Sequence, residues 1–183
     1  EPGLLAWLDA GFHGGMGYMA RHGLKRARPA ELVPGTVRVI SARMDYLPRT
    51  SAPGLPVGET DWLAAERAAL HDSQRAVVSV YARGRDYHKV LRARLQSLAT
   101  RLAAVAGPLG HRVFTDSAPV LEVELATRAG LGWRGKHTLA LSREAGSMFF
   151  LGELFVDLAL PPDDPASAHC GQCRACIAVC PTQ

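Results

Sequence analysis

The residues best suited to chemistry are the four cysteines of the chain, which lie together in the run HCGQCRACIAVCPTQ. They are Cys170, Cys173, Cys176 and Cys180, and Pro181 follows the last of them. The spacing C-x2-C-x2-C-x3-C-P is typical of bacterial ferredoxin-type iron–sulfur ligation, in which the fourth cysteine ligates a second cluster. We therefore expect the first three cysteines to hold one cluster and Cys180 to reach another, whose remaining ligands lie beyond the given chain.

A structural zinc site is the alternative for four cysteines. Zinc sites usually pair C-x2-C knuckles across a longer gap, whereas three of these cysteines recur at every third residue. The spacing favours an iron–sulfur site, so the segment predicts an electron-carrying element that serves the rest of the chain.

Asp116 is the main candidate for acid–base chemistry. It follows His111 to Thr115, which we expect to form a strand, and a side chain at the end of a strand can point into a cleft. Alternatively, Asp116 caps a helix that runs from Ser117 to about Arg128. The residues alone leave both interpretations open.

Two further runs combine cations with aromatic residues. The run Arg83 to Lys89 (RGRDYHK) follows Tyr81 and suits a phosphate-bearing or flat partner, or it is a solvated turn before a helix. The run Trp133 to His137 lies among glycines, which allow a backbone to approach a ligand, or its tryptophan belongs to the core.

The composition is that of a folded globular chain. Of 183 residues, 48% are hydrophobic and 21% charged, and the net charge of +4 permits a polyanionic partner without requiring one. The basic residues Arg21, Lys25, Arg26 and Arg28 either contact nucleic-acid phosphates or form a solvated face. No apolar run approaches the roughly 18 residues of a membrane span, and no secretory signal is recognisable. We expect a cytoplasmic protein without a membrane segment, in whose reducing surroundings clustered cysteines hold metal.

The hydrophobic pattern predicts interleaved helices and strands. Helices are expected at Leu4–Leu8, at Met16–Arg21, from Thr60 or Asp61, and after Lys89. The last of them should end at Gly107, and its apolar face should contain Leu91, Leu95, Leu98 and Leu102. Strands are expected at Thr36–Asp45, Ala76–Tyr81 and His111–Thr115, and Thr138–Ser142 with Met148–Leu160 should form an antiparallel hairpin. A mixed α/β (α+β) layer architecture follows, and Pro161–Pro165 reads as a linker.

Five segments resemble the cobalamin-dependent epoxyqueuosine reductases, in order and over essentially the whole chain. They are GFHGGMGYMARHGLKRARPAELVPGT, YARGRDYHKVLR, VFTDSAPVLEVELATRAGLGWRGKHTL, GSMFFLGELFVD and CGQCRACIAVCP. In one departure, Glu122 is followed by Val123, where many relatives have a basic residue. The resemblance implies an oxidoreductase of queuosine biosynthesis, which reduces the epoxide of epoxyqueuosine in the tRNA anticodon loop. It also implies a nitroreductase-like, mixed-sheet cobalamin domain at 1–160 and the first half of a two-cluster ferredoxin-like domain at 161–183.

The resemblance implies roles for individual residues as well. Asp116 matches the proton donor of the family, with cobalamin and two 4Fe-4S clusters as cofactors. The expected cofactor-binding residues are Tyr81, Asp116, Trp133, Lys136 and His137, although His137 is not expected to ligate cobalt. The implied partners are tRNA carrying epoxyqueuosine and an external electron donor, and the protein is expected to be a monomer. Other classes to weigh are a corrinoid reductive dehalogenase and a non-catalytic electron-transfer or corrinoid-binding module.

Overall fold

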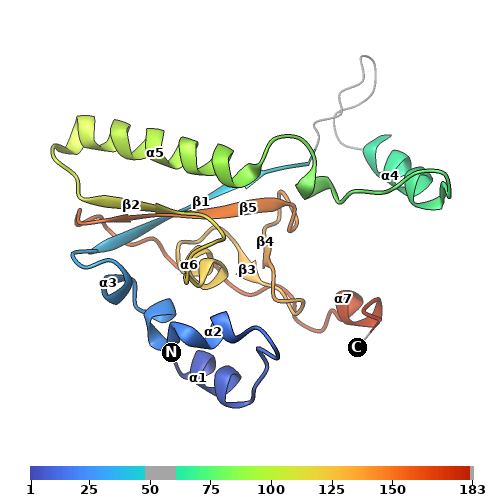
Figure 1. Cartoon of the computed structure of the whole chain (residues 1–183), viewed down its shortest axis with the longest axis horizontal. Coiled ribbons are helices and arrows are strands. Elements are labelled where there is room, and N and C mark those ends of the chain that lie inside the picture. Colours follow the sequence, from blue (N-terminus) through green and yellow to red (C-terminus); the bar gives the residue numbers. More distant parts are fainter. Residues whose placement is uncertain (48–60, 182–183) are drawn as a thin grey trace.

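The computed structural model of the protein describes residues 1–47 and 61–181, and this part is built around an antiparallel sheet (Figure 1). The sheet contains β1 (Arg38–Asp45), β2 (His111–Phe114) and β5 (Phe149–Val156) in the order β1-β5-β2. Both neighbours run antiparallel to β5, so the central strand is the last of the three in the sequence. The predicted α/β class is confirmed.

Helix α5 (Tyr87–Ala106) covers one face of this sheet (Figure 1). Its buried residues Leu91, Leu95 and Ala99 recur every four positions and face the middle of β5. Gly152 of β5 allows this close packing, because a Cβ atom there would lie 2.8 Å from Cδ1 of Leu95. The core on this face contains Ala99, Leu154 and Val156, with Ile40, Leu109, Val113 and Leu158 packed against it.

Helix α6 (Glu122–Arg128) lies on the opposite face of the sheet, together with a small hairpin of β3 (Trp133–Arg134) and β4 (Ala140–Leu141) (Figure 1). The rings of Phe114 and Phe155 meet edge to face on this side, with centroids 4.8 Å apart. The sheet is therefore covered on both faces. Residues of β5, and those that follow the end of β2, lie close to α6.

The N-terminal helices lie on the α6 side, farther from the sheet (Figure 1). They are α1 (Pro2–Asp9), α2 (Gly17–Arg21), the 3-10 helix η1 (Gly23–Ala27) and α3 (Pro29–Leu32). Arg26 is buried and donates to the carbonyl oxygens of Tyr18 and Met19, each at 3.0 Å, and Arg28 pairs with Glu1 and Glu31. Two of the four basic residues considered for phosphate contacts therefore have partners within this region.

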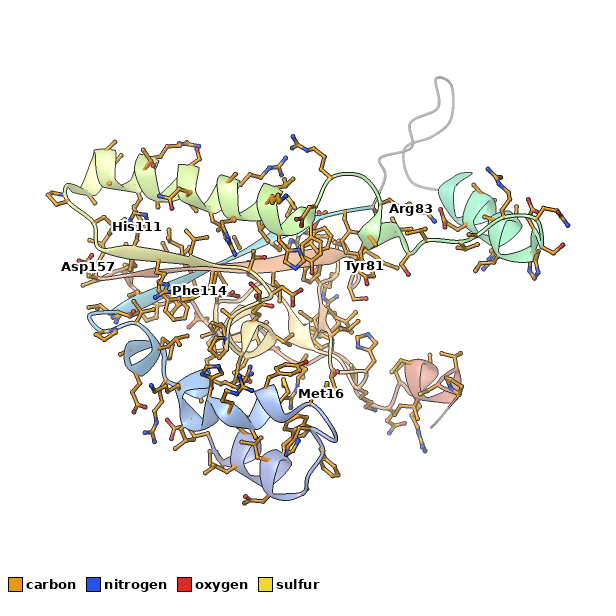
Figure 2. All side chains as sticks on the ribbon, viewed as in Figure 1. Met16, Tyr81, Arg83, His111, Phe114 and Asp157 are labelled. Atoms are coloured by element: carbon orange, nitrogen blue, oxygen red, sulfur yellow. The ribbon has the colours of Figure 1, made fainter. Side chains whose placement is uncertain are left out.

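The remaining helices are α4 (Asp61–His71), the 3-10 helix η2 (Val80–Ala82) and α7 (Ala175–Ala178). Figure 1 shows α4 beyond one end of the sheet and α7 near the C-terminus, away from the sheet. Tyr81 and Arg83 lie at the end of the sheet where α5 begins, whereas His111 and Asp157 lie at the opposite end (Figure 2). Among residues 1–47 and 61–181, no helix combines the length and the hydropathy of a membrane span.

The predicted strand at Ala76–Tyr81 is wrong. Residues 76–79 are irregular and lead into η2, with Val77 and Val78 exposed. Strand propensity takes effect only where a partner strand is at hand, and here Arg83 Nε donates to the carbonyl oxygen of Val78 at 2.8 Å. A side chain thus occupies a backbone acceptor that a sheet would have used.

The predicted hairpin between Thr138–Ser142 and Met148–Leu160 is also wrong. Strand β4 pairs with β3, whereas both sides of β5 are taken by β1 and β2. The turn itself is present, because Ser142 N–H donates to the carbonyl of Gly146 at 2.8 Å. This turn leads the chain into β5, but no strand pairing between β4 and β5 extends from it. The helix expected from Ser117 begins only at Glu122, so Asp116 does not cap it.

One assignment within α5 also needs correction, and it yields a stability test. Leu98 was expected on the apolar face but is 38% exposed, because the sheet contacts the stripe of Leu91, Leu95 and Ala99. Leu95 is 2% exposed, so Leu95→Ala should lower the free energy of unfolding by about 2–5 kcal/mol. The matched change Leu98→Ala should cost about 1 kcal/mol or less. Urea unfolding measures both, and equal losses would contradict the described packing.

Candidate active site

Asp116 stands directly after β2 in an unusual backbone conformation. Its φ of +55° lies in the left-handed region, which costs most residues about 1–2 kcal/mol but which aspartate tolerates better than most. The preceding Thr115 is fully buried, and its hydroxyl donates to the carbonyl oxygen of Leu151 at 3.3 Å. The sheet thus fixes the chain up to Thr115, and Asp116 turns its side chain away from the strand direction.

Two side chains from the start of α5 donate to the same oxygen of Asp116. The Tyr87 hydroxyl lies 2.5 Å from Asp116 Oδ2, and His88 Nε2 lies 3.0 Å from it. The Asp116 side chain is nevertheless 57% exposed, so its carboxyl group also faces outward. The end of β2 and the first turn of α5 together assemble a carboxyl, a phenol and an imidazole group.

His88 links two carboxylates. Its Nδ1 lies 2.9 Å from Asp86 Oδ1, while Nε2 faces Asp116. The hydrogen bond with Asp86, reinforced by that with Asp116, raises the pKa of His88 and favours the imidazolium form. For Tyr87, partial burial and the hydrogen bond to Asp116 raise the pKa, so this residue stays a neutral phenol that donates.

Aromatic stacking holds Tyr87 and His88 in place. The Tyr87 ring lies 4.0 Å from the Phe150 ring at an interplanar angle of 4°, and 4.0 Å from the His88 ring. The Tyr46 ring packs on Phe150 as well, at 4.7 Å. Because Phe150 belongs to β5, this stacking fixes the positions of Tyr87 and His88 relative to the central strand of the sheet.

A pair of carboxyl groups lies behind Asp116. Glu153, in the middle of β5, is 0% exposed, and among the described residues no N–H or hydroxyl group donates to either of its oxygens. It instead contacts the carboxyl group of Glu122, the first residue of α6, within hydrogen-bonding reach. Burial and the nearby Glu122 raise the pKa of Glu153 to about 9, and burial also raises the pKa of Glu122. Glu122 Oε1 accepts a hydrogen bond from the Asp116 N–H at 2.7 Å.

A cavity of about 270 Å³ opens beside Asp116. It is lined by Tyr87, Asp116, Glu122, Val123, Leu139, Ala140, Ser147, Phe149, Phe150 and Leu151. A mostly apolar wall with a few convergent polar groups is typical of a site that orients a ligand. A larger cavity of about 360 Å³ lies between α4 and Met148, but it contains none of the groups around Asp116. We place the candidate site at the smaller cavity, because the acid–base groups converge there.

Apart from Asp116, which lines the smaller cavity, the predicted cofactor-binding residues fall into two places. Tyr81 lines the larger cavity, and its ring meets that of Tyr87 edge to face, with centroids 6.4 Å apart. Trp133, Lys136 and His137 lie in the β3–β4 hairpin, where His137 Nδ1 accepts from the Leu139 N–H at 3.1 Å. That contact stabilises the turn. None of these contacts tests cofactor binding, which stays a prediction.

The cysteine segment is attached to this hairpin. Lys136 Nζ donates to the carbonyl oxygens of Gly171 and Cys173, each at 2.8 Å. The ring of His169 meets that of Trp133 edge to face at 4.9 Å. Cys170, Cys173 and Cys176 form no disulfide, and within residues 1–47 and 61–181 no three His, Cys, Asp or Glu side chains are grouped to hold a metal ion. The predicted ligand role of the four cysteines stays a prediction.

Sequence reasoning found Asp116 and the run that contains Tyr87 and His88, and the structure brings these three together. It missed Glu122 and Glu153. The available signal was Glu153 itself, the only charged residue within the strongly apolar run Phe149–Val156. A lone carboxyl group in such a strand must find a partner, because an unpaired buried charge is very costly.

The chain matches known proteins along its length. The family model described as "Epoxyqueuosine reductase QueG, DUF1730" matches residues 26–117. An epoxyqueuosine reductase from Alicycliphilus denitrificans is 69% identical over 183 residues, which is 100% of this chain and 49% of that protein. The structure of epoxyqueuosine reductase from Streptococcus thermophilus is 27% identical with a TM-score of 0.72, and covers 97% of this chain and 46% of that one.

A crystal structure of epoxyqueuosine reductase with an epoxyqueuosine-modified tRNA-Tyr stem loop has a TM-score of 0.76 at 24% identity. It covers 98% of this chain and 44% of that chain, and it shows a shared fold. The chain thus spans about half the length of the curated relatives it matches.

The carboxyl pair predicts that stability falls as pH rises. The pKa of Glu153 is about 9 in the folded protein against 4.5 for a free side chain, so between these values only the folded state keeps the proton. The free energy of unfolding should therefore decline across this range. Urea unfolding at the low and high ends of this pH range should show a smaller decline in the free energy of unfolding for Glu153→Gln, because glutamine cannot ionise. Glu124→Gln, which changes an exposed glutamate of α6, is the control, and a wild-type decline in Glu153→Gln would argue against the raised pKa.

Proposed function

The chain belongs to the epoxyqueuosine reductase family, and from this membership we propose that the protein reduces the epoxide of epoxyqueuosine in a tRNA anticodon loop to the alkene of queuosine. The observation that carries the proposal is the cluster in which Tyr87 and His88 both donate to Asp116 at the mouth of a cavity. A related enzyme has been solved with an epoxyqueuosine-modified tRNA stem loop, which supports the substrate.

The chemistry requires a positioned proton donor. Conversion of an epoxide to an alkene removes the oxygen as water and consumes two electrons and two protons. Asp116 would give a proton to the departing oxygen, a role that suits a carboxyl group open to the cavity. His88 is 39% exposed and contacts Asp116, so it can pass a proton from solvent to reload that carboxyl group. Tyr87 orients Asp116 by donating its hydroxyl hydrogen.

We propose cobalamin and two 4Fe-4S clusters as the cofactors. When bound, cobalamin supplies the electron pair for the reduction and the clusters deliver electrons one at a time. Cys170, Cys173, Cys176 and Cys180 have the donor chemistry and spacing for cluster ligation. For the corrin, the apolar cavity wall fits, as does the buried Trp133 Nε1, which has no acceptor among the described residues. Tyr81, Asp116, Lys136 and His137 complete the proposed cofactor-binding set.

Two structural units would divide this work. We assign residues 1–160 to the cobalamin-binding catalytic domain and 161–183 to the first half of a ferredoxin-like domain. Lys136 supports the arrangement, because its two hydrogen bonds hold the cysteine segment against the β3–β4 hairpin. The proposal further includes an external electron donor, a cytoplasmic location and a monomeric state.

A turnover assay of the full-length protein tests the proposal. The protein, supplied with cobalamin, a chemical reductant and epoxyqueuosine-containing tRNA, should form queuosine, which mass spectrometry of the digested nucleosides detects. Absence of queuosine despite bound cobalamin would contradict the proposed activity and favour a non-catalytic corrinoid-binding module.

Asp116→Asn tests the proton donor. Asparagine tolerates the left-handed backbone at this position but has no acidic proton, so the fold and cobalamin absorbance should persist. Turnover should fall by about 10²–10⁴-fold, the usual contribution of a general acid. Asp163→Asn, which changes an exposed aspartate in the segment between β5 and the cysteines, should behave as wild type. Near-normal turnover of Asp116→Asn would refute the assigned role.

A further inference from the structure

Glu153 occupies a place where a carboxyl group is seldom found. It lies at the centre of β5, opposite Ser41 of β1 and Phe114 of β2, so these three side chains share the sheet face that α6 covers. The Ser41 hydroxyl is also buried without a partner among the described residues. Glu153 is thus enclosed by strands on both sides and a helix above, and burial of such a group requires compensation.

The compensation is a proton shared with Glu122. Two carboxylates in hydrogen-bonding contact repel each other, so one of the pair must be protonated. Glu122 already accepts a hydrogen bond from the Asp116 N–H, which favours its ionised form. The proton therefore resides on Glu153, which donates to Glu122, and the pair carries a single negative charge.

That charge acts on the backbone of Asp116. An N–H to carboxylate contact of 2.7 Å is a charge-assisted hydrogen bond, roughly twice as strong as a neutral one. It joins the first residue of the loop 116–121 to the residue that follows the loop, and so closes this loop on itself. The bond offsets the cost of the left-handed conformation, which in turn directs Oδ2 of Asp116 toward Tyr87 and His88.

We propose that Glu122 and Glu153 are the positioning residues of Asp116: one proton, held between them inside the sheet, keeps Glu122 as the acceptor that fixes the Asp116 backbone. This inference rests on the proposed role of Asp116 as proton donor. Neither glutamate gives its proton to substrate. Their effect is the placement of the acid, so proton loss from the pair should misplace Asp116 without emptying the site.

The pair should therefore impose an upper pH limit on turnover. The groups that face it are Asp116 on the loop after β2 and His88 on α5. The cations on the same sheet face are engaged elsewhere, since Arg43 of β1 pairs with Glu144 and Arg112 of β2 lies over the Phe114 ring. The imidazole of His88 is already paired with Asp86 and Asp116, so ionisation of Glu153 would set two negative charges side by side and push Glu122 away from its hydrogen bond with Asp116.

The first test observes the hydrogen bond between the Asp116 N–H and Glu122 in the absence of substrate. In full-length protein labelled with ¹⁵N-aspartate, the Asp116 amide should resonate at low field because of its short hydrogen bond to a carboxylate. Its shift should titrate with an apparent pKa near 9 in the wild type and stay constant over that range in Glu153→Gln. A wild-type titration in Glu153→Gln, or an amide unaffected by Glu122→Ala, would overturn the proposal.

The second test measures the effect on catalysis. Glu122→Ala should lower kcat by about 100-fold, the cost of a misplaced catalytic group, while KM and cobalamin absorbance change little. Glu153→Gln supplies a permanent donor to Glu122, so it should retain far more turnover than Glu153→Ala and lose the decline above about pH 9. Glu124→Gln, two residues along α6 and paired with Arg128, is the matched control and should keep the wild-type profile. An unshifted high-pH limb in Glu153→Gln would contradict the proposal.

The two tests separate this inference from the proposed function. If the Asp116 amide titrates as expected but no queuosine forms, the carboxyl pair is confirmed as the group that positions Asp116, and the assigned reaction is wrong. If queuosine forms with a Glu122→Ala kcat equal to wild type, the reaction stands and the positioning role is refuted.

Discussion

The burial of Glu153 is the constraint on which the rest of the site depends. A carboxyl group at the centre of β5, between β1 and β2, has no route to solvent and must share its proton with Glu122. This requirement sets the start of α6 over the sheet, since Glu122 is its first residue. The hydrogen bond from the Asp116 N–H to Glu122 then closes the loop between β2 and α6, and the orientation of the Asp116 side chain follows from the buried carboxyl pair.

Two other elements converge on the same point for reasons of packing. Gly152 lets α5 lie close to β5, and Phe150 stacks on Tyr87, so the first turn of α5 is held above the end of β2. The hydrogen bonds of Tyr87 and His88 to Asp116 are a consequence of that packing. On the α6 side of the sheet, Lys136 holds the cysteine segment against the β3–β4 hairpin through the backbone carbonyls of Gly171 and Cys173.

Local patterns were sufficient for much of this fold. Helix α5 and strand β1 were predictable because hydrophobic spacing, turn residues and β-branched residues agree over eight or more positions. The strand at Ala76–Tyr81 and the hairpin before β5 were wrong because pairing depends on which distant strand is available. Asp116 was a candidate from its place after a strand, and the resemblance to the reductase family favoured it over a helix cap. Glu153 stands out as the one charged residue of the apolar run Phe149–Val156, but its partner Glu122 could not be predicted, because only the arrangement of α6 over β5 brings the two carboxyl groups together.

The most direct measurement of the central claim is the crystal structure of full-length Glu122→Ala beside that of the wild type. The wild type should show Asp116 with φ near +55° and Oδ2 in contact with Tyr87 and His88. In the variant, Asp116 should leave the left-handed region and lose at least one of these contacts, while β2 and β5 stay in place. An unchanged Asp116 conformation with both contacts intact would show that the buried carboxyl pair does not position the acid.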